Sequence, residues 1–408
     1  MPELIPFYHY GMAGPRFSFA RTESLEKLDG YYEACFPESD GMAVFVRSNS
    51  NDNEFYGAID LKGERLIKPV FSEIGSFSEG LAPARMASGK FGYINHSGAW
   101  FIAPRWASAG SFRNGRAIVG NGTQFGVINR SGQEIVPLIY EEFYWPSGLM
   151  SHDNYAVVKD AHRGWGLLNL TTLSESVRCN WEEIKFNIGN GLVPVKMKNK
   201  WGFADMKGKL IVPCLYENTE GFSEGLASVI LNGKSGYINT SGQVVIPIEY
   251  NFAGYFFEGT GAVYSRTDGK WLWLDQTGKI LKEFSSAEYN LFGRFSEGRI
   301  RFAKRDSIGK LRWGFMDHSG NVVIQPIYGE CTDFAWGRAS VSGTTPYNDV
   351  LWGLINPFGD PITKIKYSRL YPLMGFEGIL WYCEGGQSLM STPMIDRNGI
   401  EYFSGRGE

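Results

Sequence analysis

Residues 201–225 read WGFADMKGKLIVPCLYENTEGFSEG, and the parts of this stretch recur along the chain. It opens on an aromatic–glycine pair, passes through an Asp-x-x-Gly turn and an apolar run with a proline, and closes on Phe-Ser-Glu-Gly. Recurrence of such a pattern at a fixed period indicates a repeat architecture. The clearest pairs are Trp165–Gly166, Trp201–Gly202, Trp313–Gly314 and Trp352–Gly353, with others at 56–57, 91–92 and 125–126 and degenerate copies at 235–236 and 271–272.

The glycine that closes each repeat sets the period. The closing glycines are Gly41, Gly80, Gly115, Gly148, Gly191, Gly225, Gly259, Gly298, Gly337 and Gly378. Their mean spacing is about 37 residues, so about ten repeats fill residues 36–404. We expect residues 1–35 to form an N-terminal cap and residues 405–408 a C-terminal tail. A chain of 408 residues ordinarily forms roughly two to four domains, whereas this period predicts one continuous all-β array.

One repeat can be followed in residues 225–250, which read GLASVILNGKSGYINTSGQVVIPIEY. Residues 226–231 are typical of a strand, which ends at the strong hairpin signal Asn232-Gly233. Residues 235–239 and 243–247 are the second and third predicted strands. We expect Pro247 to end the third, because proline cannot donate to a ladder. Each repeat is therefore predicted to be a three-stranded antiparallel meander followed by a loop.

The middle strand explains the aromatic–glycine pair. Side chains alternate between the faces of a strand, so Trp201 and Phe203 share one face and Gly202 and Ala204 the other. Because both faces are apolar, this strand is predicted to be central and buried. A glycine there weakens the strand unless something fills the space, and we expect an aromatic ring of a neighbouring repeat to do so.

The repeats resemble the WG, or KWG, repeat family of bacterial proteins. The consensus of that family runs through Trp-Gly, Asp-x-x-Gly, Ile-Pro and Phe-Ser-Glu-Gly, and residues 201–225 and 313–326 match it best. The resemblance covers about nine tenths of the chain and implies a β-rich fold with no catalytic motif. The family is also distantly similar to cell-wall-binding repeats, which stack β-hairpins as a solenoid. Departures at Ser235, Leu272 and residues 169–172 predict local irregularity.

Two arrangements of ten repeats are compatible with the pattern. Propeller blades have four strands in about 40–45 residues, and rings usually close with about 4–8 blades. Three predicted strands and ten repeats favour an open β-solenoid, or superhelix, over a closed propeller-like ring or rings.

Composition excludes several classes of protein. The formal net charge is -3 and the pI is about 6.1, which argues against a nucleic-acid binder because such proteins need a basic surface. No apolar run reaches the roughly 18 residues that span a membrane, and the N-terminus lacks the pattern of a secretory signal. We therefore expect a cytoplasmic protein that contacts neither nucleic acid nor membrane.

No set of residues typical of an active site is found. His96 and His318 both occupy the second position of an Asn/Asp-x-Ser-Gly turn, which favours exposed turns over metal ligands. The five cysteines are scattered without a CxxC pair, which indicates buried apolar side chains. We predict no catalytic residues, no metal site and no cofactor.

Two sets of residues are candidates for binding. Acidic residues precede several closing glycines and are interpreted as solvated turn residues, because a ladder of like charges is destabilising. Among the twelve tryptophans, most occupy apolar positions of the repeat, but Trp336 stands where other repeats have Glu or Asn. That position predicts an exposed Trp336, in contrast to buried Trp201 and Trp313. The candidate binding residues are Trp336, Trp100 and Trp381.

These observations predict a non-enzymatic repeat scaffold that binds a macromolecule, most simply a protein, along an extended surface. A glycan- or cell-wall-binding protein is the alternative, based on the aromatic content and the hairpin-repeat likeness. An enzyme with an unrecognised site is the third.

Overall fold

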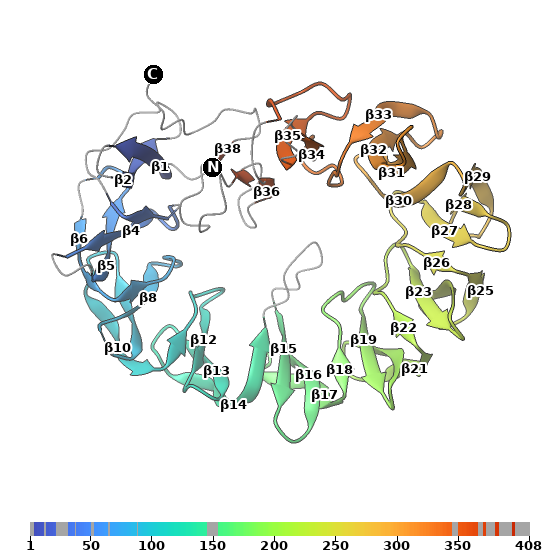
Figure 1. Cartoon of the computed structure of the whole chain (residues 1–408). Coiled ribbons are helices and arrows are strands. Elements are labelled where there is room, and N and C mark those ends of the chain that lie inside the picture. The colour runs from blue at the N-terminus through green and yellow to red at the C-terminus, as the bar shows by residue number, and fades with distance from the viewer. Residues whose placement is uncertain are drawn as a thin grey trace. The chain divides into compact units, whose positions relative to one another are not determined.

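The computed structural model describes residues 4–11, 14–21, 32–36, 38–49, 53–63, 66–87, 89–144, 154–344, 350–365, 370–372, 380–382 and 394–395 (Figure 1). It divides into two compact bodies, Met1–Glu141 with Tyr367–Glu408, and Glu142–Lys366, and each is described by itself. Every described element is a strand, and all strand pairs are antiparallel. Since these residues include no helix, they include no helical membrane span.

The strands of the first body form short consecutive sheets. They are β1 Leu4–Gly11, β2 Gly14–Arg21, β3 Ala34–Cys35, β4 Met42–Ser48, β5 Glu54–Asp60, β6 Leu66–Phe71, β7 Glu73–Ile74, β8 Leu81–Arg85, β9 Phe91–Asn95, β10 Trp100–Trp106, β11 Ser108–Ala109, β12 Arg116–Gly120 and β13 Phe125–Asn129, with β36 Leu370–Pro372, β37 Leu380–Tyr382 and β38 Met394–Ile395. Strand β14, Glu134–Tyr144, ends in the second body.

The second body continues the same pattern. Its strands are β15 Tyr155–Asp160, β16 Gly164–Asn169, β17 Ser174–Trp181, β18 Glu183–Ile184, β19 Leu192–Met197, β20 Lys200–Asp205, β21 Leu210–Tyr216, β22 Asn218–Thr219, β23 Leu226–Leu231, β24 Lys234–Asn239, β25 Val244–Tyr250, β26 Phe252–Ala253, β27 Gly261–Ser265, β28 Lys270–Leu274, β29 Ile280–Ser285, β30 Tyr289–Ser296, β31 Arg299–Arg305, β32 Leu311–Met316, β33 Val322–Tyr328, β34 Ala339–Thr344 and β35 Val350–Ile355.

The prediction of three strands per repeat is wrong, because most sheets have four. In the sheet β22-β23-β24-β25 the additional strand is β22, in which Asn218 pairs with Ile230 and Thr219 with Val229. The corresponding strands β3, β7, β18 and β26 are also two residues long. Two residues are too few to show an alternation of apolar and polar side chains, so the sequence pattern gives no sign of them.

The last strand of a repeat bulges over the glycine of the aromatic–glycine pair. Trp201 pairs with Tyr216 and Phe203 with Val212, so β21 has two more residues than β20 between these pairs. A Cβ on Gly202 would lie 2.4 Å from the carbonyl oxygen of Val212. The corresponding distance is 2.5 Å or less at Gly57, Gly92, Gly126 and Gly314, and at Gly236 the carbonyl oxygen of Pro247 would lie at 2.5 Å.

Two expectations about this strand are therefore corrected. The space beside Gly202 is filled by the backbone of β21 in the same repeat, and not by a ring of a neighbouring repeat. Pro247 lies within β25, at the bulge, and does not end the strand, and Pro213 lies in the same way within β21. A bulge leaves backbone groups outside the ladder, so a residue without an N–H is tolerated there.

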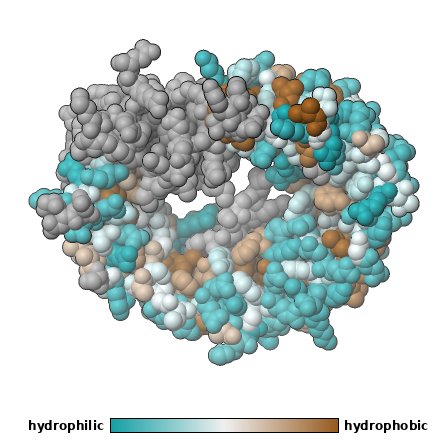
Figure 2. Space-filling view, viewed as in Figure 1, coloured by the Kyte–Doolittle hydropathy of each residue, from teal (hydrophilic) through white to brown (hydrophobic). Residues whose placement is uncertain are grey.

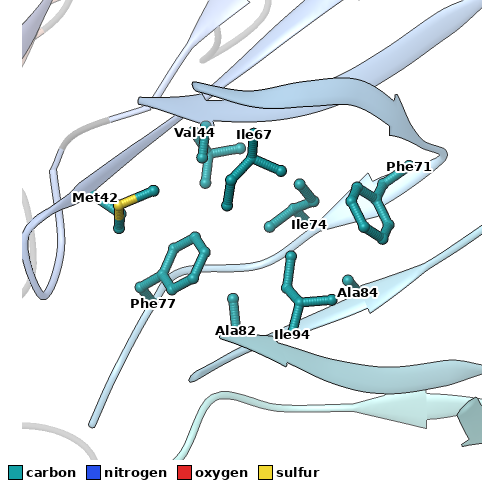
Figure 3. Packing of buried hydrophobic residues seen from close by; sticks show 10 residues of the cluster. Met42, Val44, Ile67, Phe71, Ile74, Phe77, Ala82, Ala84 and Ile94 are labelled. Atoms are coloured by element: carbon teal, nitrogen blue, oxygen red, sulfur yellow. The ribbon is translucent and has the colours of Figure 1, made fainter. Parts of the chain in front are cut away.

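The hydrophobic core lies between consecutive repeats. Figure 3 shows Met42, Val44, Ile67 and Phe71 of one repeat facing Ile74, Phe77, Ala82, Ala84 and Ile94 of the next. Trp201, Phe203 and Val212 pack in the same way against Ala227, Val229 and Ile238 of the following repeat. A single sheet this small could not bury both faces, and stacking supplies the second layer.

The degenerate repeats differ in how far they depart from the rest. The repeat with Ser235 keeps the common register, with Ser235 opposite Tyr250 and Tyr237 opposite Ile246, so the expected irregularity is absent there. The repeat with Leu272 is irregular, because β28 and β29 pair without the bulge that follows the aromatic position elsewhere. Residues 169–172 link β16 to β17, and the next residue, Leu173, has φ 56°.

The N-terminal hairpin β1–β2 is joined to the first repeat by packing. Phe19 of β2 is fully buried in a cluster with Tyr32, Cys35, Ala43, Phe45 and Ile59. The strand β3, which includes Cys35, already belongs to the sheet of that repeat.

Candidate functional site

Each closing glycine forms a tight hairpin turn together with the residue before it. In the turn Ser223–Leu226, the N–H of each end residue donates to the carbonyl oxygen of the other, at 2.9 and 3.0 Å. Both central residues have positive φ, 51° at Glu224 and 84° at Gly225, which is characteristic of a type I′ turn. The residues that precede the described closing glycines all have φ of 51–54°; they are Asp40, Glu79, Asn114, Asn190, Glu224, Glu258, Glu297 and Trp336.

The acidic residues of these closing turns connect one repeat to the next. The carboxylate of Glu224 accepts the N–H of Gly259 at 2.9 Å, and that of Glu258 accepts the N–H of Gly298 at 3.0 Å. The same bond joins Asp40 to Gly80, Glu79 to Gly115, Asn190 to Gly225 and Glu297 to Gly337. Their interpretation as merely solvated turn residues is therefore wrong. The donor and the acceptor of each bond are 35–40 residues apart in the sequence and come together only when the repeats stack, so the sequence pattern does not predict the bond.

Several of these carboxylates also face a polar side chain on the Asn/Asp-x-x-Gly turn of the next repeat. Glu258 Oε2 lies 2.9 Å from His318 Nε2, and Asp40 Oδ2 lies 3.5 Å from His96 Nε2. The His318 ring stacks on Phe295 with centroids 4.0 Å apart. Both histidines thus lie on turns, where they bridge neighbouring repeats. Among the described residues, no group of His, Cys, Asp or Glu could hold a metal ion.

Trp336 interrupts this series of polar residues. Its side chain is 47% exposed, as its position in the repeat predicts, and its φ is 53°. Its carbonyl oxygen accepts bonds from the guanidinium of the buried Arg338, at 3.0 and 2.6 Å. An indole offers no acceptor for a backbone N–H, so Trp336 cannot make the bond that its acidic counterparts make.

The contrast with the tryptophans of the middle strands is only partly as predicted. Trp201 is 4% exposed, as expected. Trp313 is half-buried, so its predicted burial is wrong. The guanidinium of Arg301 lies 5.3 Å from the centre of the Trp313 ring, and Lys185 Nζ lies 4.9 Å from that of Trp201, so a cation over the ring is common to both. Trp165 and Trp352 are likewise half-buried.

The other two candidate tryptophans differ in what the structure describes. Trp100 is the first residue of β10, is 37% exposed and meets Phe71 edge-on at 5.7 Å. Its position is apolar and exposed in other repeats as well, at Leu210, Val244 and Ile280. Trp381 lies in β37, and its side chain is outside the described residues.

An exposed aromatic cluster escaped the sequence analysis. Tyr144 and Phe186 are 44% and 41% exposed, and their rings meet edge-on at 5.5 Å. Tyr144 also stacks beside Trp165 at 6.3 Å. The sequence did contain one sign of this cluster. Phe186 stands five residues before its closing glycine, at a position where other repeats have a glycine, such as Gly110 and Gly254.

The buried thiols are protonated at neutral pH. Burial raises the pKa of Cys179 and of Cys331 to about 12, and the four described cysteines are free. A thiol with so high a pKa is a poor nucleophile. On the surface, Figure 2 shows mainly hydrophilic residues with separate hydrophobic patches over the described part of the face in view.

Comparison with known families identifies the family to which this repeat belongs. The family described as WG containing repeat matches residues 56–90, 91–122, 125–160, 201–234, 236–271, 313–342 and 352–387. The chain belongs to this family. The matches begin at or next to the aromatic–glycine pair, so the WG repeat is counted from the middle strand of one sheet to the first long strand of the next.

No curated protein matches the sequence of this WG-repeat chain, and the following solved structures are remotely similar to it. A eukaryotic initiation factor shares 12% identity over 87% of this chain and 93% of its own, with a TM-score of 0.44. The computationally designed Ika8 protein shares 13% over 71% and 98%, with a TM-score of 0.30. BamB from Moraxella catarrhalis shares 12% over 71% and 94%, with a TM-score of 0.27. Scores this low add nothing to the fold described above.

Proposed function

We propose that this WG-repeat chain is a non-enzymatic scaffold that binds another protein, with Trp336 as a contact residue. The observation that carries the proposal is the exposed indole at a turn position where the other described repeats have Asp, Glu or Asn. A left-handed backbone costs a bulky residue about 1–2 kcal/mol, and exposure of the ring returns no packing energy. Tryptophan is enriched among residues that dominate protein interfaces.

The test compares two exposed apolar residues of the second body. Partners recovered with the native protein are identified by mass spectrometry, and their affinity is then measured by calorimetry for the Trp336→Glu and Ile308→Glu variants. Glutamate at 336 restores the residue type of the sister turns, so the fold is retained. We expect Trp336→Glu to weaken binding by about thirtyfold, equivalent to about 2 kcal/mol. Ile308, which is 72% exposed, is the matched control and should have no effect. Equal affinity of Trp336→Glu and wild type would contradict the proposal.

The aromatic cluster of Tyr144, Trp165 and Phe186 favours glycan binding as the second candidate. Exposed rings stack on the apolar faces of sugars, and two of these three are more than 40% exposed. Chitohexaose added to the protein should quench tryptophan fluorescence in wild type and not in Tyr144→Ala. Quenching of equal size in both would show that this cluster does not bind the sugar.

The site of action and the arrangement of the repeats belong to the same proposal. Free cysteines are typical of proteins in reducing compartments, which supports a cytoplasmic location.

The fourth strand removes one argument for an open superhelix, but ten repeats still exceed the about 4–8 blades of typical rings. We therefore retain the open array, and small-angle X-ray scattering distinguishes it from a closed ring by the radius of gyration.

A further inference from the structure

The last strands of the four-stranded sheets are edge strands, and all but one carry the same protection. β6, β10, β21, β25 and β33 each contain a proline and a shift of register at the bulge, through Pro69, Pro104, Pro213, Pro247 and Pro326. Proline and bulges are devices that keep an edge strand from pairing with another chain. β29, which reads ILKEFS, has no proline and lacks the shift beside the aromatic position, since it pairs regularly from Trp271–Phe284 to Trp273–Lys282. It keeps only the later shift, between Trp273 and Leu274, and the charged residues Lys282 and Glu283.

The missing protection reflects a shorter strand. Between the residues that pair with the two aromatic positions of the middle strand, β21 has three residues, Pro213 to Leu215, whereas β29 has only Glu283. Two residues are therefore absent, the proline among them. As a result β29 lacks the bulge beside the aromatic position, and five of its six residues are exposed.

The hydrogen bonds fix which backbone groups of β29 face outward. Ser286 donates to the carbonyl oxygen of Gly269 at 2.8 Å, and Gly269 and Ser286 are the next opposed pair beyond Lys270–Ser285. Since bonded and non-bonded pairs alternate in an antiparallel ladder, Phe284 and Lys282 bond to β28. The N–H and C=O groups of Glu283 therefore point away from the sheet, as do those of Ser285, whose carbonyl oxygen already accepts the N–H of Glu288 at 3.1 Å. β29 is the terminal strand of its sheet, and no other described strand pairs with it (Figure 1).

We infer that the free edge of β29 is a docking site for an extended segment of another protein, which pairs with it as an additional strand. The outward N–H and C=O of Glu283, together with the outward N–H of Ser285, match the donors and acceptors of an extended peptide backbone. Ile280 and Leu281, 46% and 45% exposed, offer apolar contact beside them. The side chain of Glu283 is 45% exposed and its Oε2 already pairs with Lys270 Nζ at 2.5 Å, so a cationic side chain on the partner segment would share this carboxylate with Lys270.

A second copy of this chain is the less suitable occupant. In an antiparallel pair, outward residues must lie opposite outward residues. The two-fold registers that use the whole strand place Glu283 opposite Glu283, or Lys282 opposite Lys282, of the second copy. Like charges directly opposite one another destabilise a sheet. The partner segment therefore comes from a different protein, in keeping with the proposed function, on which this inference rests.

The experiment removes a single outward donor. Glu283→Pro deletes the N–H that points away from β28 and leaves the ladder between β28 and β29 intact, as prolines do on the sister edges. Glu283→Ala keeps that N–H and is the matched control. The probe is the fluorescein-labelled hexapeptide Val-Thr-Val-Arg-Val-Thr, with a version N-methylated at alternate residues as the control that needs no change of the protein. Binding is measured by fluorescence anisotropy, and thermal unfolding verifies that each variant is folded.

We expect saturable binding with a dissociation constant below about 1 mM. Glu283→Pro or N-methylation should lower the affinity at least about tenfold, and Glu283→Ala should lower it far less. No binding at about 1 mM peptide, or equal binding by wild type and Glu283→Pro, would overturn the inference. Dimerisation of the wild type that Glu283→Pro abolishes would also overturn it, in favour of a second copy.

A parallel measurement separates this inference from the proposed function. Trp336→Glu should bind the hexapeptide as wild type does. A protein partner that requires Trp336 but binds Glu283→Pro normally would uphold the proposed function and overturn the role of β29.

Discussion

At the scale of single residues, the glycine of the aromatic–glycine pair is determined by backbone contact. At Gly202 an added methyl group would lie within 2.8 Å of backbone atoms of Val212, Pro213 and Cys214. Backbone cannot move aside as a flexible side chain can, so the bulge and the glycine require each other. The aromatic partner of the pair is placed by the cross-strand contact of Trp201 with Tyr216.

Gly202→Ala should therefore destabilise the protein by about 1–3 kcal/mol, and Gly202→Val by more. The matched control is Gly254→Ala in the same body, because a Cβ there would lie at an ordinary 3.5 Å from its nearest neighbours. Urea midpoints measured by tryptophan fluorescence give the comparison. Equal midpoints for the alanine variants at 202 and 254 would contradict the contact between glycine and bulge.

Trp336 is a bulky, exposed side chain on a left-handed backbone, so it is expected to lower the stability of the protein. Asparagine tolerates the left-handed region better than tryptophan, and Asn114 and Asn190 occupy it in sister turns. Trp336→Asn is thus expected to leave the melting temperature unchanged or to raise it, by up to about 1 kcal/mol in stability. A calorimetric scan decides, and a clear fall in melting temperature would mean that the indole packs within the protein.

At the scale of elements, the closing turns are coupled from one repeat to the next. Glu258 accepts from Gly298 and contacts His318, so one carboxylate joins two segments of the next repeat. Ser223 adds a buried bond of 2.7 Å from its hydroxyl to the carbonyl oxygen of Phe256. These bonds fix how adjacent sheets lie, since apolar packing alone is not directional.

Glu258→Ala should cost about 1 kcal/mol, because the N–H of Gly298 loses its acceptor. Glu258→Gln keeps an acceptor oxygen and is expected to retain most of the stability. Amide hydrogen exchange provides the sharper reading, with faster exchange at Gly298 in the alanine variant only. If the two variants exchange alike at this amide, the carboxylate is not its acceptor in solution.

At the scale of the whole molecule, stability is distributed over interfaces between neighbours. Each core cluster of the second body joins adjacent repeats, as Trp201 and Phe203 do with Val229 and Ile238. In such an array the free energy of unfolding is approximately a sum over repeats and their interfaces. Damage to one repeat should therefore spread only to the repeats beside it.

Hydrogen exchange of Gly202→Val measures this spread. Exchange should rise most in residues 192–216, less in residues 174–184 and 226–250, and not at all in residues 299–344. The wild type under the same conditions is the reference. A uniform rise through residues 299–344 would show instead that the second body unfolds as one cooperative unit.

The sequence by itself determined the repeat, its period and its all-β character, because these follow from local residue types that recur. Turn glycines such as Gly225 and the alternation around Trp201 are legible in one repeat. It also identified the exposed Trp336, since a position that holds Asp, Glu or Asn in sister repeats is a solvent-accessible position.

Only the tertiary structure decided the rest. The two-residue strands, the bulge over Gly202 and the bonds from Glu258 to Gly298 all depend on the positions of backbone atoms, which residue types alone do not specify. The regular edge of β29 is an intermediate case. The missing proline is visible in the sequence, but its meaning appears only when the sister strands show what that proline does. Side-chain chemistry repeats along the chain and can be read there, whereas backbone contacts between segments exist only in the folded protein.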